Sequence, residues 1–322
     1  MLITCGVSVQ GESHRIKDIV CQDWNKIYVN DGIIIAAVAD GLSSSFHSDM
    51  ASKVASELSV AYCSERITKN SLEEEILLVI KQSFEYAQIH IEQKARMLEY
   101  ELDECDTTLC LVVLLEGVLY CGQAGDSGVI ALRDDGFFER VTNIVDDDDG
   151  YVDPLYRSEK WIFLKYKHKA RSLVLVTDGI WNMLVPCLLR NEKYPLDNEL
   201  LNYFLNNMAL ENLNKEQINE WLQNTIEDIL PDHVNHDDKT MIIIIDTEIV
   251  VHEQDEEYYK WPSKDLLNEL SKAYEDELYN YRLQIRNGDK ESVDNSDQES
   301  EKKNQKNGLG IKRFIIKRAK GL

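Results

Sequence analysis

The feature that most constrains the fold is a set of apolar runs that meet an aspartate at one end. Ile33–Ala39 holds seven apolar residues in a row, and Asp40 and Gly41 follow it directly. Its length and its β-branched residues are typical of a strand that is buried on both faces. Three further strand-like runs carry an aspartate at an end, beside a glycine or a second aspartate: Asp126, Asp178 and Asp237. A carboxylate at such a position is costly unless a positive charge compensates it.

If these strands pack together, their four carboxylates converge on one point, which is typical of a hard-metal site. Oxygen ligands favour Mg²⁺ or Mn²⁺, and a set without His or Cys disfavours zinc and copper. Should Asp40 bridge two ions, Asp178 and Asp237 could complete one of them, and the carbonyl of Gly41 could serve the other. Two ions about 4 Å apart would activate a water for attack on a phosphoryl group, without a Ser or Cys nucleophile.

The predicted strands and helices come in blocks rather than in βαβ alternation. Three strand-like runs precede two helices with apolar stripes, and four more strand-like runs follow. This order predicts an α+β fold, a four-layer β-sandwich of two mainly antiparallel sheets flanked by helices on both outer faces. Locally, Asn30–Gly32 predicts a hairpin turn, Ser71–Glu74 predicts a capping box, and Trp161–Lys165 with Arg171–Thr177 predicts a further hairpin.

Composition along the chain predicts the domain organisation. Residues 1–250 are expected to form a catalytic domain, within which residues 182–236 are a helical insertion near the site. A helical extension over 251–286, a disordered linker over 287–310 and a basic tail over 311–322 are expected to follow. No run approaches the ~20 apolar residues of a membrane span, and the N-terminus shows no secretory signal, so a cytoplasmic protein is expected.

The charge distribution restricts the classes of partner. A net charge of −23 argues against nucleic acid as a partner and suits divalent cations and basic proteins. The residues Ile311–Leu322, by contrast, carry five Lys or Arg and no acid. This basic tail could dock on a partner, on anionic lipid or on the protein's own acidic surface; a disordered tail is the alternative. Seven cysteines without a Cys-x-x-Cys pair indicate reduced thiols rather than a zinc site.

Six short motifs recur in the order of a known family across residues 2–247. They are Gln22–Asp23, Val38–Gly41, Asp106–Thr108, Gly125–Ser127, Val176–Trp181 and Asp237–Thr240. With them, the chain resembles the metal-dependent protein phosphatase family, protein phosphatase 2C, and Gly11–His14 followed by Cys21–Asp23 resembles its bacterial branch. The resemblance implies a β-sandwich flanked by helices and the hydrolysis of phosphoserine or phosphothreonine in proteins at a binuclear Mg²⁺ or Mn²⁺ centre.

The resemblance also implies a role for individual residues. Asp40 would bridge both ions, and Gly41 would offer its carbonyl. Asp178 and Asp237 would bind the first ion, Asp23 would act through a water, and Asp126 with Asp178 could hold a third ion. Arg15 is the candidate for binding the substrate phosphate, because the guanidinium fork matches phosphate geometry. Thr107 and Thr108 are expected to support the site by hydrogen bonds, and Trp181 is expected in the core.

Two departures from the family pattern leave the proton donor and the second ion's shell open. Leu42 stands where many members have a histidine, and Gln22 stands where an acidic residue is usual. His14 or His47 could supply the proton to the leaving alkoxide, or a metal-bound water could do so. The predicted function is a Ser/Thr protein phosphatase in signalling, opposed by a cognate Ser/Thr kinase. The alternative is a catalytically weak module that binds or regulates a phosphoprotein.

Overall fold

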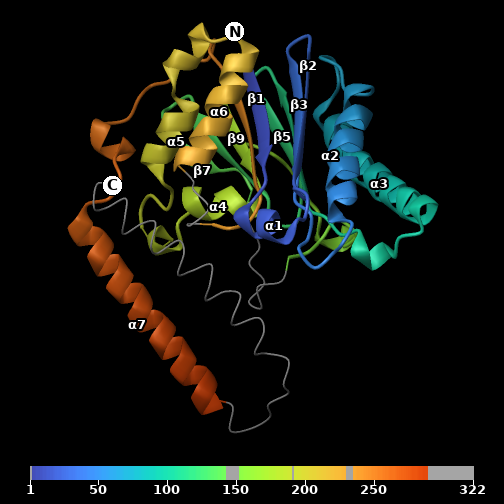
Figure 1. Ribbon diagram of the computed structural model, residues 1–322. Helices are drawn as coiled ribbons and strands as arrows, with labels where there is room; N and C mark the ends of the chain where they lie inside the picture. Colours follow the sequence, from blue (N-terminus) through green and yellow to red (C-terminus); the bar gives the residue numbers. More distant parts are fainter. Residues whose placement is uncertain (1, 143–151, 191, 230–234, 289–322) are drawn as a thin grey trace.

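Two five-stranded sheets stack face to face in the computed structural model of the protein (Figure 1). The structure describes residues 2–142, 152–190, 192–229 and 235–288. One sheet has the order β1-β10-β9-β6-β7, and its strands are Leu2–Val9, Lys239–Asp246, Ala170–Val176, Gly128–Arg133 and Phe138–Arg140. The other has the order β2-β3-β4-β5-β8, and its strands are Trp24–Asn30, Ile33–Ala39, Leu109–Leu115, Val118–Ala124 and Ile162–Lys165.

Strand β3 explains why a seven-residue apolar run suits this architecture. All seven residues are buried. Ile34, Ala36 and Val38 belong to the core between the two sheets. The alternate residues Ile33, Ile35, Ala37 and Ala39 belong to a second core under the helices that cover the outer face. Because successive side chains of a strand point to opposite faces, a strand between two apolar layers needs no polar position.

Helices cover the outer face of each sheet, so the fold has four layers (Figure 1). Helices α2 (Ser48–Ser64) and α3 (Glu73–Leu98) pack on the sheet that contains β3. Helices α4 (Asp178–Leu184), α5 (Asn198–Leu205) and α6 (Lys215–Ile229) lie on the other sheet, where Met241, Ile243 and Ile245 of β10 face them. The predicted α+β sandwich with antiparallel sheets and two helical outer layers is confirmed.

The hairpin turn predicted at Asn30–Gly32 is present, and a second turn has the same backbone conformation. Asp31 and Gly32 join β2 to β3 with φ angles of 50° and 76°, and Glu116 and Gly117 join β4 to β5 with 52° and 79°. Two consecutive left-handed residues match the twist of the flanking strands, which is why a glycine follows the acidic residue in each turn.

Two local predictions are wrong. Trp161–Lys165 and Arg171–Thr177 do not form a hairpin, because β8 pairs with β5 in one sheet and β9 pairs with β10 and β6 in the other. The capping residue of α3 is Leu72 rather than Ser71: the N–H of Leu72 donates to Glu75 Oε2 at 2.8 Å. The Ser71 hydroxyl instead accepts from the N–H of Thr68.

Two further helices, one after the first strand and one after the last, complete the described fold. The short helix α1 (Glu12–Lys17) follows β1 and was not among the predicted helices. The long helix α7 (Lys264–Gly288) projects away from the sandwich (Figure 1), and its Leu267 packs against Leu188. Short 3₁₀ helices also occur, at Leu102–Glu104, Ser158–Lys160, Cys187–Leu189, Met208–Asn212 and Glu256–Tyr259.

The predicted domain boundaries remain predictions. The stretch 182–236 includes α5 and α6, which form an outer layer of the sandwich. Of the predicted linker 287–310 only the first two residues are described, and the basic tail 311–322 lies outside the described residues. In the part of the chain that the structure describes, no helix combines the length and the apolar character needed to cross a membrane.

Candidate metal centre

The five predicted metal-binding or water-binding aspartates converge at one end of the sandwich. Asp40 follows β3, Asp178 begins α4 directly after β9, Asp126 lies between β5 and β6, Asp237 precedes β10, and Asp23 precedes β2. Burial raises the pKa of Asp40 well above its usual range, and the charges of the other four carboxylates raise it further. Such mutual repulsion requires that the five side chains lie close together.

The backbone around Asp40 is fixed by the segment that precedes β4. The carbonyl of Asp40 accepts hydrogen bonds from the N–H of Thr108 at 2.8 Å and from the hydroxyl of Thr107 at 2.9 Å. The N–H of Asp40 donates to the Thr108 hydroxyl at 3.0 Å. The expected supporting role of both threonines is confirmed, and it leaves the carboxylate as the part of Asp40 that can bind a ligand.

Gly41 is required by close packing rather than by an unusual φ angle. A Cβ at this position would lie 2.7 Å from the side chain of Ser48 and 2.8 Å from the carbonyl oxygen of Gln22. The N–H of Gly41 donates to that same carbonyl at 3.1 Å. Any side chain here would therefore push apart the two segments that carry Asp23 and Asp40.

Asp23 is the most deeply placed of the five. It is 1% exposed, and its Oδ2 accepts a hydrogen bond from the hydroxyl of Thr177 at 2.8 Å. Burial and the charge of Asp238 raise its pKa to about 7. The other four aspartates are partly accessible. Asp23 therefore closes the cluster from solvent, and the other four residues provide the access to it.

Asp178 is held in the same cluster by the strand before it. Burial raises its pKa well above the usual range, and the charges of Asp126, Asp237 and Asp23 raise it further. Trp181, three residues further on, is buried against Gly128, where a Cβ would lie 2.2 Å from the ring. Trp181 thus belongs to the core, as predicted, and its packing fixes the first turn of α4.

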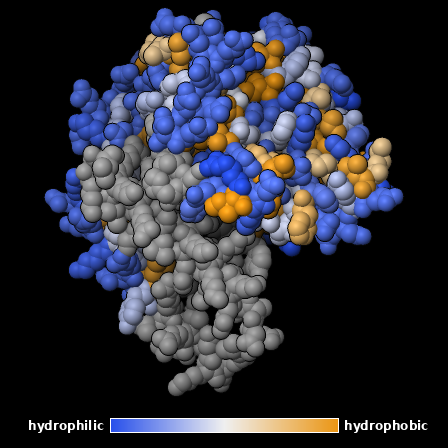
Figure 2. All heavy atoms as spheres, viewed as in Figure 1, coloured by the Kyte–Doolittle hydropathy of each residue, from blue (hydrophilic) through white to orange (hydrophobic). Residues whose placement is uncertain are grey.

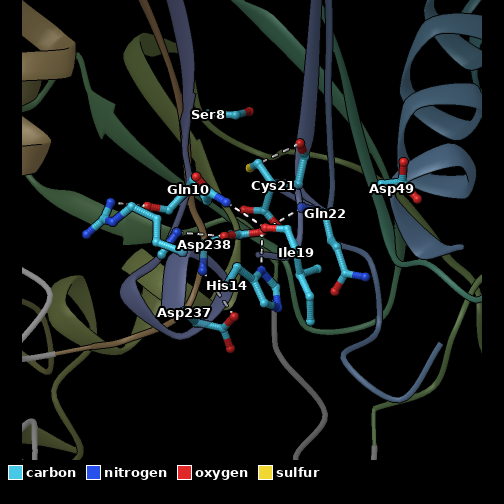
Figure 3. Close-up of polar contacts among 12 residues, drawn as sticks. Ser8, Gln10, His14, Ile19, Cys21, Gln22, Asp49, Asp237 and Asp238 are labelled. Atoms are coloured by element: carbon cyan, nitrogen blue, oxygen red, sulfur yellow. Dashed lines mark hydrogen bonds and ion pairs between the residues drawn. The ribbon is translucent and has the colours of Figure 1, made fainter. Parts of the chain in front are cut away.

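Asp238 was given no role from the sequence, and it proves to be the most fully hydrogen-bonded carboxylate of the region (Figure 3). Its Oδ1 accepts from the N–H of Gly11 at 2.7 Å, and its Oδ2 accepts from the N–H of Gln22 at 2.6 Å. The Nδ1 of His14 lies 2.9 Å from the same Oδ2. These contacts join α1, the segment before β2 and the start of β10, and the name Asp238 clasp denotes them below.

The structure places the two candidate histidines in different surroundings. His14 is 5% exposed, and its ring is held by Asp238. His47 stacks on Tyr100, with ring centroids 3.4 Å apart, and its Nε2 faces Glu104 at 3.8 Å. Of the two, only His14 is bound to a residue adjacent to the aspartate cluster.

Two cations lie beside the cluster. Arg15 is exposed on α1, and its Nη1 donates to the carbonyl of Gln10 at 2.6 Å. Lys239, which the sequence did not single out, is 1% exposed and donates to the carbonyl of Asp237 at 3.1 Å. Burial lowers the pKa of Lys239; Asp237 opposes this effect and the charge of Arg15 adds to it. Arg15 therefore lies within electrostatic reach of the segment that carries Asp237.

The rim of the site exposes apolar side chains. Ile16 in α1 and Val20 in the segment before Asp23 are 77% and 60% exposed, and Phe46 in the loop after Asp40 is 80% exposed. Figure 2 shows an apolar patch among hydrophilic atoms at the position of α1. A largely hydrophilic surface that turns apolar beside a polar centre is typical of a binding region.

Comparison with known proteins agrees with this arrangement. A family model, described as protein phosphatase 2C, matches residues 10–227. The chain belongs to the protein phosphatase 2C family. The match includes Asp23, Asp40, Asp126 and Asp178 but ends before Asp237. No curated protein matches the chain.

Solved structures show that the fold is that of the protein phosphatase 2C family. A serine/threonine phosphatase of S. agalactiae shares 16% identity, with a TM-score of 0.50 and coverage of 76% of this chain and 99% of that chain. A bacterial serine phosphatase shares 13% identity, with a TM-score of 0.50 and coverage of 79% and 100%. At this identity the likeness establishes the fold alone. The chemistry depends on the residues of this chain.

The donor set of this protein phosphatase 2C family member fits a hard divalent cation. Among the described residues, no three acidic, His or Cys side chains are arranged as a preformed coordination shell. Asp40 instead lies among the carboxylates of Asp23, Asp126, Asp178 and Asp237, whose charges raise its pKa. A set of carboxylate oxygens with no sulfur or nitrogen matches the ligand preference of Mg²⁺ and Mn²⁺, on which this family generally depends.

Proposed function

We propose that the protein is an Mg²⁺- or Mn²⁺-dependent phosphatase that removes phosphate from phosphoserine and phosphothreonine in proteins. The observation that carries this proposal is the convergence of Asp23, Asp40, Asp126, Asp178 and Asp237. Buried carboxylates that raise one another's pKa are unfavourable in a structural role, because they stabilise nothing unless cations join them. Family membership supports a phosphatase among the enzymes that use such a centre.

The proposed roles follow from how each side chain is held. Asp40, whose backbone is held by Thr107 and Thr108, would bridge two ions, and the carbonyl of Gly41 would complete the second. Asp178 and Asp237 would bind the first ion, and Asp126 with Asp178 could hold a third. Asp23, oriented by Thr177, would hold a water in place. When bound, the ions would activate a water and neutralise the charge of the phosphoryl oxygens.

Arg15 and His14 are the proposed protein groups for the substrate phosphate and the leaving group. Arg15 is exposed at the edge of the cluster, where a rotation of its long side chain could bring the guanidinium to a phosphate. The carboxylate of Asp238 on Nδ1 fixes the His14 ring and leaves Nε2 as the nitrogen that exchanges a proton. Leu42 brings no proton donor to the position that is a histidine in many members.

Gln22 acts through its backbone and its amide. Its N–H binds Asp238, its carbonyl accepts from Gly41, and its side-chain amide lies 3.4 Å from the carbonyl of Ser45. The residue thus links the Asp238 clasp to the loop after Asp40, a role that needs no negative charge. The proposed substrates would be phosphoproteins made by a Ser/Thr kinase. The kinase, a signalling role and a cytoplasmic location are predictions from the sequence.

Release of inorganic phosphate from a phosphothreonine peptide tests the proposal. The wild-type protein should release phosphate with Mn²⁺ and lose this activity in EDTA, and Asp178→Asn should abolish it. Asp31→Asn, in an exposed turn where Asn adopts the same backbone conformation, is the matched control and should retain full activity. A protein that binds Mn²⁺ but releases no phosphate from phosphopeptides or from p-nitrophenyl phosphate would instead be the catalytically weak binding module.

A further inference from the structure

A cavity of about 380 Å³ lies beside the candidate metal centre, between α3, the 102–107 segment and Leu155–Tyr156. Its apolar wall includes Ile91, Cys105 and Leu155, each less than 10% exposed. Leu102 and Tyr156 at the cavity are 48% and 51% exposed, so apolar surface continues to the solvent. This volume is within the range of pockets that bind small ligands or single side chains, roughly 300–1,000 Å³.

The cavity and the aspartate cluster share one wall. Thr107 lines the cavity, and its hydroxyl donates to the carbonyl of Asp40 at 2.9 Å. Thr107 also forms an antiparallel bridge with Gly41, and the carbonyl of Asp106 accepts from the N–H of Leu42 at 3.1 Å. A peptide whose phosphorylated residue is at the cluster therefore has the cavity within a few residues, since an extended chain advances about 3.3 Å per residue.

The cavity carries negative charge without a matching cation. Asp103 and Asp106 both line it, the first exposed and the second half-buried. Burial and the charge of Asp103 raise the pKa of Asp106 to about 6. Within the described ranges, neither carboxylate forms an ion pair with Lys, Arg or His, whereas Glu92 at the same cavity pairs with Arg96 at 3.6 Å. An apolar cavity with two unmatched carboxylates complements a side chain that is apolar in its stem and cationic at its tip.

We infer that this cavity, formed by α3, the 102–107 segment and Leu155–Tyr156, binds residues that flank the phosphorylated residue of the substrate, an apolar side chain next to Arg or Lys. The inference rests on the proposed function, whose substrate it specifies as a basic phosphopeptide. Leu102, Tyr156 and Ile91 would contact the apolar side chain, and Asp103 and Asp106 would contact the cation. The metal centre would then supply the chemistry, and the cavity would select the sequence around the phosphate.

The test compares two phosphothreonine peptides that differ only in a Leu-Arg pair replaced by Ala-Gln, placed two to four residues from the phosphothreonine. The readout is the ratio of their kcat/KM values, with p-nitrophenyl phosphate as a substrate too small to reach the cavity. The wild-type ratio should be about 10 or more, since one matched charge and one buried apolar side chain each contribute a factor of several. Asp103→Asn with Asp106→Asn, and separately Tyr156→Ala, should bring the ratio below about 3.

Glu101→Gln is the matched control, because Glu101 is exposed one residue before Leu102 and does not line the cavity. It should keep the wild-type ratio. A wild-type ratio near 1, or a ratio that the cavity variants leave unchanged while p-nitrophenyl phosphate is hydrolysed, overturns the inference and leaves the proposed function intact. Lys317→Gln with Arg318→Gln in the full chain should not change the ratio. If it brings the ratio below about 3, the basic tail rather than the cavity selects the Leu-Arg pair, and the inference is wrong.

Absence of turnover on every substrate would count against the proposed function alone. In that case fluorescence anisotropy with unphosphorylated forms of the same two peptides measures peptide binding at the cavity directly. Preferential binding of the Leu-Arg peptide, lost in Asp103→Asn with Asp106→Asn, supports the cavity assignment. Equal or absent binding of both peptides overturns it.

Discussion

The Asp238 clasp and the aspartate cluster are neighbouring groups of carboxylates that meet their charge in opposite ways. Asp238 accepts two backbone N–H donors and pairs with the ring of His14. Asp40 is surrounded by the carboxylates of Asp23, Asp178, Asp126 and Asp237, which raise its pKa. The protein therefore satisfies the charge of Asp238 with its own atoms, whereas the proposed function assigns the charge of the cluster to cations from solution. A carboxylate whose charge is compensated by hydrogen bonds holds the segments of the site together. Carboxylates that repel one another remain able to bind a ligand.

Asp40→Asn should have the largest effect of all, and that effect should be a loss of activity. Removing the proposed bridging charge is expected to lower kcat/KM by about 10³-fold, because a metal centre supplies several kcal/mol of transition-state stabilisation. The free energy of unfolding without divalent ions should stay the same or rise, since one repelling charge is gone. Phosphate release measures the loss of activity, and urea unfolding in EDTA measures the free energy of unfolding. Asp31→Asn, in the turn at the other end of β3, should keep full activity and lose at most about 1 kcal/mol of stability, because the ion pair of Asp31 with Lys69 is exposed.

Asp238→Ala should have the largest effect on stability. It leaves the N–H groups of Gly11 and Gln22 and the ring of His14 without their partner, so the free energy of unfolding should fall by about 3 kcal/mol. The shift of the urea midpoint at constant slope measures it. An unchanged midpoint combined with lost Mn²⁺ binding would mean that Asp238 is a metal ligand, and the contrast between the two groups would be wrong.

Divalent ions should stabilise the cluster and leave the clasp unaffected. With Mn²⁺ at about 100 times its dissociation constant, the free energy of unfolding should rise by about 2.7 kcal/mol per site. Asp40→Asn should abolish this gain, and His14→Gln should keep it although it lowers the baseline. Urea unfolding with and without Mn²⁺ measures both. A gain that survives in Asp40→Asn would place the ions elsewhere.

Thr177→Val should have the smallest effect, a small loss of stability together with weaker Mn²⁺ binding at the aspartate cluster. Its hydroxyl donates to Asp23 Oδ2 and accepts from the N–H of Thr240 at 3.1 Å, so about 1 kcal/mol of stability should be lost. Mn²⁺ affinity should fall about 10-fold, because Thr177 orients an aspartate of the site. Thr142→Val is the matched control: Thr142 is a buried threonine that accepts from the N–H of Val129. It should lose similar stability at unchanged Mn²⁺ affinity, measured by calorimetry.

The sequence predicts those parts of the structure that depend on local pattern. Ile33–Ala39 could be identified as a doubly buried strand because its residues allow no other environment, and the aspartates at strand ends follow from such runs. The sequence predicted a role for Asp237 and none for Asp238, although the two adjacent residues share the same sequence context. Only the three-dimensional approach of Gly11, Gln22 and His14 separates a bound carboxylate from one that faces the cluster.

Other features escaped the sequence because they depend on how distant segments meet. Strands β8 and β9 are separated by a connection of hairpin length, yet they belong to different sheets, and local spacing does not distinguish a hairpin from a crossing between sheets. Lys239 follows two aspartates in a polar stretch, where a lysine is usually exposed, so the sequence gave no reason to expect its burial. The cavity beside Thr107 is formed by three segments, of which none alone predicts a concave surface.

Calorimetric titration of Mn²⁺ into the ion-free protein tests the central claim most directly, because it does not depend on the choice of phosphorylated substrate. The wild-type protein should bind two Mn²⁺ ions, and Asp238→Asn should bind the same number wherever it remains folded. Asp40→Asn should bind neither ion with measurable affinity. Two ions bound equally well by the wild-type protein and by Asp40→Asn, or none bound by the wild-type protein, would contradict the assignment of this aspartate cluster as the metal centre.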